Sequence, residues 1–279
     1  MAVQHGRIMP YYQPKVDLRT GRIVGAEALL RWFDAGDVLR YPADMQPAFA
    51  TPVLAMRIFD LMLAAVVKDM QRWLSVGLPL PVSINLSHAD MCDPDLLRRV
   101  FAQLDAHSVP PHLLEVEITE DASLHRSAEI IGRNLKGLAE AGVRISLDDF
   151  GTGYASLTHL KSLPIDYLKL DRSFIRDIAR NEDDQAIVGS MIALARALRL
   201  DVVAEGVEHA DQADRVLDLG CEIVQGFLYG RAVPASHLTQ RLMLGGQAEA
   251  QVSPREGAPE IGPDRSRHGL AIVGTIGLR

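Results

Sequence analysis

Cysteine and long apolar runs are the scarcest features of this 279-residue sequence. Its two cysteines, Cys92 and Cys221, show neither a disulfide pattern nor metal-ligand spacing, which favours a reducing, cytoplasmic location. A transmembrane helix needs about 20 apolar residues, whereas the strongest candidate, residues 61–67, lies between Asp60 and Lys68. We therefore expect a core helix there, no membrane segment, and no signal segment at the start of the chain.

Positive charge is also in short supply. The chain has 29 lysines and arginines against 36 aspartates and glutamates, a net charge of -7 and a pI of about 5.7. This balance, without a basic stripe, argues against binding to a nucleic-acid polymer. A ligand that carries phosphate would therefore need positive charge supplied locally. Hydrophobic residues make up 48% of the chain, enough for one substantial core or two smaller ones.

Eight short apolar runs have the character of strands, and several lack strict alternation, as expected of strands buried on both faces. They span residues 7–18, 22–32, 80–87, 113–120, 143–150, 165–171, 200–207 and 221–228. Helical patterns lie between the later runs. One face is predicted to carry Ala128, Ile131, Leu135 and Leu138, and another Ile187, Met191, Leu194 and Leu198 after acidic residues suited to a helix N-terminus. This alternation predicts parallel strands joined by crossovers.

The first two runs are different, because only residues 19–21 separate them, which is too short for a crossover and right for a hairpin. The sequence therefore predicts an α/β fold, a (β/α)8 TIM-like barrel with its first strand antiparallel to the rest. Such barrels take roughly 250 residues. We expect this domain over residues 1–246. Residues 247–279, rich in Gly, Pro, Glu, Ser and Arg, are expected to form a disordered tail.

Polar residues near the ends of these runs are the most informative feature. In a barrel they would meet at the C-terminal mouth, where barrel enzymes keep their chemistry. Gln13 joins them because an antiparallel strand presents its beginning to the same face. Singly, such residues are equally compatible with turns and helix caps. The set comprises Gln13, Glu27, Asn85, Glu117, Asp148, Asp149, Lys169, Glu205 and Gln225.

The adjacent pair Asp148 and Asp149 distinguishes the two interpretations. The strand-end set offers oxygen donors and no histidine, and oxygen-only ligation selects Mg²⁺ or Mn²⁺ over zinc. Two neighbouring aspartates can reach different ions of a two-metal site, and those cations would make the adjacent charges tolerable. The following residues 151–153, Gly-Thr-Gly, lack the ending of a P-loop and are better interpreted as a turn than as a phosphate cradle.

Taken in order, these motifs resemble the EAL family of cyclic di-GMP phosphodiesterases. The matching segments lie within residues 11–227 and read "YYQP", "AEALLRW", "INLS", "EITE", "DDFGTGYASL", "LKLD", "AEGVE" and "QGF". The resemblance implies hydrolysis of cyclic di-GMP to linear 5′-pGpG with two Mg²⁺ or Mn²⁺ ions. Ca²⁺ is expected to inhibit, because it accepts looser coordination.

The resemblance also implies roles for individual residues. Metal ligands would be Glu27, Asn85, Glu117, Asp148, Asp149 and Glu205, and catalytic groups Lys169, Glu205 and Glu27. The substrate would contact Gln13 through guanine, Arg31 through phosphate, and Gln225. Glu120 would anchor the loop over residues 149–160, which links the metals to a homodimer interface, with Glu208 and Asp171 as supporting residues. Family members are often fused to a sensory or diguanylate cyclase domain.

The sequence departs from the family pattern after Trp32, where residues 41–60 lack the usual Phe-Ile-Pro segment and its acidic residue. This departure affects the expected grip on substrate more than the metal site. The motifs leave two alternatives to the phosphodiesterase. A non-catalytic cyclic di-GMP receptor typically lacks several metal ligands, whereas every ligand position is filled here. For Mg²⁺-assisted enolate chemistry, no Lys or His matches the base position.

Overall fold

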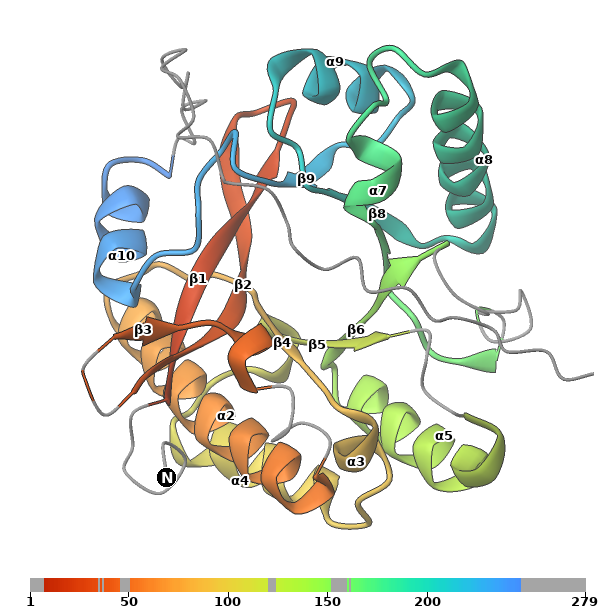
Figure 1. Ribbon diagram of the computed structural model, residues 1–279. Coiled ribbons are helices and arrows are strands. Elements are labelled where there is room, and N and C mark those ends of the chain that lie inside the picture. The colour runs from red at the N-terminus through yellow and green to blue at the C-terminus, as the bar shows by residue number, and fades with distance from the viewer. Residues whose placement is uncertain are drawn as a thin grey trace, which may run out of the picture.

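The computed structural model of the protein describes residues 8–34, 36, 38–45, 51–119, 124–151, 160 and 162–246. It shows a closed barrel of eight strands with helices outside it (Figure 1). All eight predicted runs form strands, and one further two-residue strand, β3, pairs with β2. The strands are β1 Ile8–Asp17, β2 Arg22–Phe33, β3 Leu39–Arg40, β4 Val82–Asn85, β5 Leu114–Thr119, β6 Arg144–Phe150, β7 Tyr167–Leu170, β8 Asp201–Glu205 and β9 Ile223–Gln225.

The barrel closes through its first strand. The order is β1-β9-β8-β7-β6-β5-β4-β2, and β1 pairs back onto β2. β1 is antiparallel to both β2 and β9, and the remaining barrel pairs are parallel. The tight β1–β2 turn follows from Gly21, whose φ of +66° suits glycine, and from Asp17, whose side chain accepts bonds from the backbone N–H groups of Arg19 and Thr20. The predicted barrel and its antiparallel first strand are confirmed.

The helices pack their apolar faces on the barrel. They are α2 Pro52–Ser75, α3 His88–Met91, α4 Leu96–Ala106, α5 Leu124–Glu140, α7 Arg172–Ile175, α8 Glu182–Leu198, α9 Ala210–Asp218 and α10 Ala235–Met243, with short 3-10 turns η2 Pro42–Met45 and η3 Pro111–Leu113. The core helix predicted over residues 61–67 is confirmed within α2. On α5, Ile131, Leu135 and Leu138 are buried as predicted, whereas the side chain of Ala128 lies outside the described residues.

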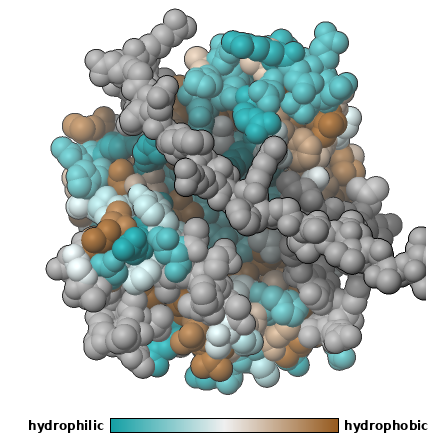
Figure 2. Space-filling model, in the orientation of Figure 1, coloured by the Kyte–Doolittle hydropathy of each residue, from teal (hydrophilic) through white to brown (hydrophobic). Residues whose placement is uncertain are grey.

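The predicted apolar face of α8 is confirmed in part. Met191 and Leu194 are partly buried against the core, whereas Ile187 and Leu198 are exposed. The fully buried residues of α8 are Val188, Ile192 and Ala195. Apolar residues flank the buried face of α8 on both sides, so two adjacent faces of this helix have similar apolar patterns in the sequence. On the side of the molecule that Figure 2 shows, the coloured residues have hydrophilic side chains gathered over α9 and only small, scattered hydrophobic patches.

At its C-terminal end, the described chain still contacts the barrel. The backbone N–H of Ile23 donates to the carbonyl of Gly246 at 2.8 Å, so residues up to this point pack against β2. The predicted tail, residues 247–279, lies outside the described residues, and the boundary at 246 stays a prediction. Among the described helices, none combines the length and apolar character needed to cross a bilayer.

Candidate metal centre

The strand ends bring the predicted polar residues together. Gln13 lies opposite Glu27 across the β1–β2 ladder, and Asn85 lies opposite Glu117 across β4–β5. On the other side of the barrel, Glu205 of β8 lies opposite Gln225 of β9. Because parallel strands present their C-terminal ends to one mouth, these residues surround a common centre.

Lys169 of β7 lies at that centre, with a side chain only 1% exposed. Its Nζ lies 2.8 Å from Glu117 Oε2, 3.0 Å from Asp148 Oδ1 and 3.8 Å from Glu27 Oε2. It also lies 2.5 Å from Glu205 Oε1, an ion-pair contact without hydrogen-bond geometry. One ammonium group therefore touches carboxylates from four different strands, and it cannot neutralise them all.

A second buried lysine lies below the first. Lys15 Nζ donates to Glu115 Oε1 at 2.9 Å and to Glu117 Oε1 at 3.1 Å, and all three side chains are buried. Sequence reasoning missed Lys15 and Glu115. The two-residue periodicity of strands could have identified them. Lys15 follows Gln13 by two residues, and Glu115 precedes Glu117 by two, so each pair shares the inward face of its strand.

Amide side chains fix Glu27 at the rim of this cluster. Glu27 Oε2 accepts a bond from Gln225 Nε2 at 2.6 Å, and Glu27 Oε1 accepts one from Asn85 Nδ2 at 3.1 Å. Gln225 Nε2 also lies 3.2 Å from Gln13 Oε1, and Gln13 in turn donates to the carbonyl of Gly230. The two amides therefore hold the carboxylate of Glu27 in one orientation.

Asp148 and Asp149 reach the site together because the strand is irregular there. The β6–β7 register shifts between Leu147 and Phe150, and Asp149 has a φ of +55°, in the left-handed region that Asp tolerates better than most residues. Carboxylate oxygens of Asp148, Asp149 and Glu205 lie within 4.8 Å of one another. In a regular strand, adjacent side chains would point to opposite faces.

The glycine that follows has a packing reason for its identity. Gly151 has a φ of +99°, and a Cβ there would lie 2.4 Å from Met191 Cε. The φ of Gly151 fits a turn at this residue. Thr152 and Gly153 lie outside the described residues, as does Glu120.

Among the described residues, the charges of this interior do not balance. Five carboxylates contact Lys15 and Lys169, which leaves -3 when all are ionised: those of Glu27, Glu115, Glu117, Asp148 and Glu205. The donor group of Asp148, Asp149 and Glu205 contains only carboxylates, with no histidine or cysteine. Such a surplus of hard oxygen donors fits divalent cations of the Mg²⁺ class.

The pKa values show how the surplus is distributed. Burial would raise the pKa of Glu117, but Lys169 and Lys15 lower it to about 2. Burial raises the pKa of Glu205 to about 8, and burial with the charge of Glu117 raises that of Glu27 to about 7. Burial would lower the pKa of Lys169, but the surrounding carboxylates raise it well above its ordinary value. Without cations, the surplus is relieved by protons on Glu27 and Glu205.

The remaining predicted residues lie around this cluster. Arg31 is on the same side of β2 as Glu27, with its guanidinium beside the rings of Tyr11 and Tyr41. Asp171 caps α7 by accepting a bond from the N–H of Ser173, which suits a supporting role. Glu208 is exposed, and its N–H donates to the side chain of Gln212.

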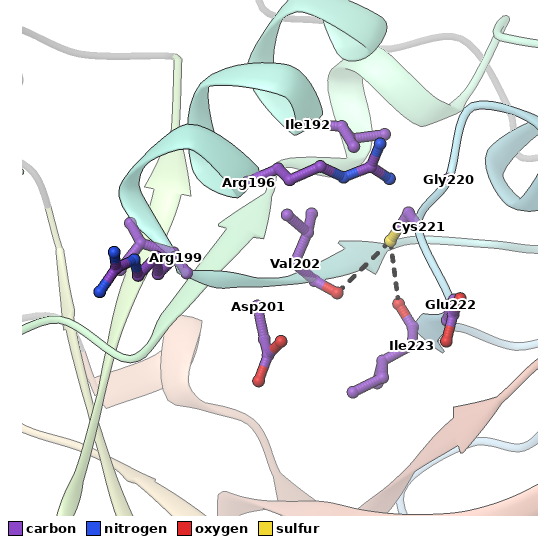
Figure 3. A pocket seen from close by; sticks show the side chains of 10 residues that line it. Ile192, Arg196, Arg199, Asp201, Val202, Gly220, Cys221, Glu222 and Ile223 are labelled. Atoms are coloured by element: carbon purple, nitrogen blue, oxygen red, sulfur yellow. Dashed lines mark hydrogen bonds between the residues drawn. The ribbon is translucent and has the colours of Figure 1, made fainter.

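Two hollows help to locate the functional end. One of about 460 Å³ opens beside Asn85 and Thr119, next to the carboxylates, and is mostly apolar. Another of about 390 Å³ lies at the opposite ends of β8 and β9 (Figure 3), where Arg196 reaches toward Cys221. Burial raises the pKa of the Cys221 thiol to about 12, and the thiol donates to the carbonyls of Val202 and Ile223, so Cys221 is no nucleophile. Both cysteines are free, as predicted.

Comparisons with known proteins agree with this geometry. A family model described as EAL domain matches residues 1–232. The chain is 40% identical over 238 residues to the bifunctional diguanylate cyclase/cyclic di-GMP phosphodiesterase MucR of Pseudomonas aeruginosa, covering 85% of this chain and 35% of that protein. It is 38% identical over 217 residues to the cyclic di-GMP phosphodiesterase PA2567 of the same organism, covering 78% and 37%.

A solved structure gives the same result. The PaMucR phosphodiesterase in complex with c-di-GMP superposes with a TM-score of 0.79 at 39% identity, covering 85% of this chain and 96% of that one. The chain thus spans about a third of the length of these two curated relatives and nearly all of the solved phosphodiesterase chain.

Proposed function

The chain belongs to the EAL domain family, and we propose that it is a metal-dependent phosphodiesterase that hydrolyses cyclic di-GMP to linear 5′-pGpG. Two relatives bear the name of cyclic di-GMP phosphodiesterase, and a solved neighbour binds c-di-GMP. The observation that carries the proposal is the surplus of carboxylates around Lys15 and Lys169, which among the described residues leaves -3 when all groups are ionised.

We propose that this surplus holds two Mg²⁺ or Mn²⁺ ions. Two divalent cations would offset the charge. The carboxylate oxygens of Asp148, Asp149 and Glu205 lie within 4.8 Å of one another, close enough to ligate a shared ion. Glu27, Asn85 and Glu117 complete the proposed ligand set. When bound, such ions lower the pKa of water and stabilise charge on phosphate oxygens. Ca²⁺ is proposed to compete without supporting turnover.

The chain's own residues supply binding and proton transfer. Hydrolysis adds water across one P–O3′ bond, so a proton leaves the attacking water and the 3′ oxygen departs. Lys169 keeps its proton because its pKa is raised, so we assign it charge stabilisation rather than the role of base. We propose Glu205, whose Oε1 lies beside Lys169 Nζ, as the proton acceptor through a carboxylate oxygen that is not bound to a cation.

Substrate contacts are assigned at the rim. Arg31 is proposed to contact a phosphate, because its half-buried guanidinium supplies the local positive charge that an acidic protein otherwise lacks. Gln13 and Gln225, which bond to each other beside Glu27, are proposed to contact guanine and complete the pocket. Three further proposals rest on family resemblance. They are a homodimer formed through the segment after Asp149 with Glu120 as its anchor, a cytoplasmic location, and fusion to or regulation by a sensory domain.

The test is direct. Protein is incubated with cyclic di-GMP and Mg²⁺ or Mn²⁺, and the nucleotides are separated by chromatography. Appearance of pGpG, and its absence when EDTA exceeds the metal, supports the proposal. Binding of cyclic di-GMP without any product would instead identify a non-catalytic receptor. Equal turnover with excess EDTA would exclude the metal-dependent mechanism.

A further inference from the structure

An aromatic side chain from the atypical segment after Trp32 lies on the proposed phosphate contact. The guanidinium carbon of Arg31 lies 4.7 Å from the centre of the Tyr41 ring and 5.8 Å from that of Tyr11. Both distances are within the range of cation–π attraction. Arg31 Nη1 also donates to the carbonyl of Leu30 at 2.8 Å, so the guanidinium is held by its own backbone and by two rings.

The hairpin that carries Tyr41 is firmly built. Asp34 Oδ1 accepts bonds from the N–H groups of Gly36 and Val38, and Asp34 Oδ2 accepts one from Arg40 Nε at 2.9 Å. These bonds close the turn between β2 and β3, and β3 pairs with the end of β2. The chain direction after β3 therefore returns Tyr41 to the level of Arg31.

A second contact fixes the backbone of Tyr41. Its N–H donates to Asp44 Oδ2 at 3.0 Å, and the N–H of Asp44 donates back to the carbonyl of Tyr41 at 2.9 Å. Tyr41 is 52% exposed, so packing in the core is not what holds its side chain there. Backbone hydrogen bonds hold Tyr41 at the rim, and its ring lies against the guanidinium of Arg31. This arrangement is suited to orient the guanidinium.

We propose that Tyr41 is a positioning residue that holds Arg31 in the orientation that receives a phosphate of the nucleotide, an inference that rests on the proposed function. An unrestrained arginine loses much side-chain freedom when it binds an anion. A guanidinium already held against Tyr41 loses less, so affinity rises without a new contact to the ligand. The bond to Leu30 uses one N–H, which leaves other N–H groups of the fork to the phosphate.

The experiment compares four variants with the parent in Mg²⁺, measuring kcat and KM for cyclic di-GMP. Tyr41→Ala and Tyr41→Leu are expected to raise KM about three- to tenfold, the size of one cation–π contact, with kcat within about twofold. Tyr41→Phe keeps the ring and is expected to match the parent. Val38→Ala, on the same hairpin and 50% exposed, is the control and should change neither parameter.

A double-mutant cycle tests whether the effect passes through Arg31. In an Arg31→Ala background, Tyr41→Ala is expected to change KM no further. Additive effects, a Tyr41→Leu variant equal to the parent, or a fall in kcat at constant KM would each overturn the inference.

The outcomes separate the two proposals. A parent that binds cyclic di-GMP without hydrolysing it refutes the proposed enzyme, and the same variants are then compared by binding titration, with the same expected fold-changes. A parent that hydrolyses normally but is insensitive to the Tyr41 variants refutes only this inference. A parent that neither binds nor hydrolyses refutes both.

Discussion

The interior of the barrel has two levels that differ in how their charges are satisfied. At the inner level, Lys15 donates hydrogen bonds to both Glu115 and Glu117, and Glu117 also accepts a hydrogen bond from Lys169. At the outer level, Asp148 and Glu205 contact Lys169, and the carboxylate oxygens of Asp148, Asp149 and Glu205 lie within 4.8 Å of one another. The inner carboxylate Glu117 has a pKa lowered to about 2, whereas the outer Glu205 has one raised to about 8.

This contrast assigns different tasks to similar residues. A buried ion network that is fully paired holds its members in place, although its net contribution to stability is small. A buried group of carboxylates without enough cations is costly, and relieves that cost by taking up protons or metal ions. The inner level therefore positions Glu117, while the outer level is prepared to bind cations.

Removing divalent cations should have the largest effect, because the outer carboxylates and the remaining proposed ligands all lose the ions that complete the site. EDTA in excess is expected to lower turnover of cyclic di-GMP by more than about a thousandfold, measured as pGpG released, since the outer carboxylates alone cannot lower the pKa of water. Restoring Mg²⁺ or Mn²⁺ should recover the activity, whereas Ca²⁺ should not. Recovery with Ca²⁺ alone would contradict the tight coordination assumed here.

Asp149→Asn should come next, because it keeps the size of an outer side chain and removes its charge. We expect turnover to fall on the order of a thousandfold, which corresponds to about 4 kcal/mol, while cyclic di-GMP still binds through the rim. Steady-state kinetics and a binding titration measure the two effects separately.

The control for that variant is Asp183→Asn, in the first turn of α8, which should cost little. If Asp149→Asn stays within about tenfold of the parent, Asp149 serves only the turn, and the outer level needs no carboxylate there.

The sequence was sufficient for the outer level and insufficient for the inner one. Strand-end carboxylates such as Glu27 and Asp148 were visible because each follows an apolar run, and barrel topology alone brings strand ends together. Lys15 and Glu115 lie within runs, where a strand buried on both faces gives no contrast between inside and outside. Nothing local shows that these two residues, one hundred positions apart, face each other.

Other features depended on tertiary packing. β3 has only two residues, Leu39 and Arg40, and exists because Asp34 closes the turn before it. The face of α8 was displaced because its apolar residues exceed one stripe, and only contact with the barrel selects Val188 and Ile192. The sequence indicated that α8 is amphipathic but not which of its sides the barrel would bury, and β3 was not predicted.

At the inner level, Lys15→Met tests whether pairing matters there. Removal of one partner of a buried pair leaves the carboxylates of Glu115 and Glu117 short of a cation, and is expected to lower the free energy of unfolding by about 3 kcal/mol in a urea titration. Lys15→Met with Glu115→Gln should regain part of this loss. Arg19→Ala is the control, because the Arg19–Glu222 pair is exposed and worth about 1 kcal/mol or less.

The smallest expected effect is a pH dependence that comes from Glu205 at the outer level and from Glu27 at the rim. Without cations, Glu27 and Glu205 have pKa values raised to about 7 and about 8 from an ordinary 4.5. The folded protein then holds protons that the unfolded chain has released, so their contribution to stability is lost as pH rises through 7 and 8. Glu117 acts oppositely, since its pKa of about 2 makes its contribution present above 4.5 and lost only toward pH 2.

Divalent cations bind the deprotonated carboxylates, so they compete with protons at pH 6 and less at pH 8. Saturating Mg²⁺ or Mn²⁺ should therefore raise Tm more at pH 8 than at pH 6, by a few degrees, since about 1 kcal/mol shifts Tm by roughly 2–4 °C in a protein of this size. Differential scanning calorimetry with and without metal cancels the titration of the histidines, which is common to both. Glu205→Gln removes one of the two raised groups and should flatten the difference. An equal gain at both pH values would mean that the outer carboxylates are ionised without cations, and that the two levels do not differ in the way their pKa values indicate.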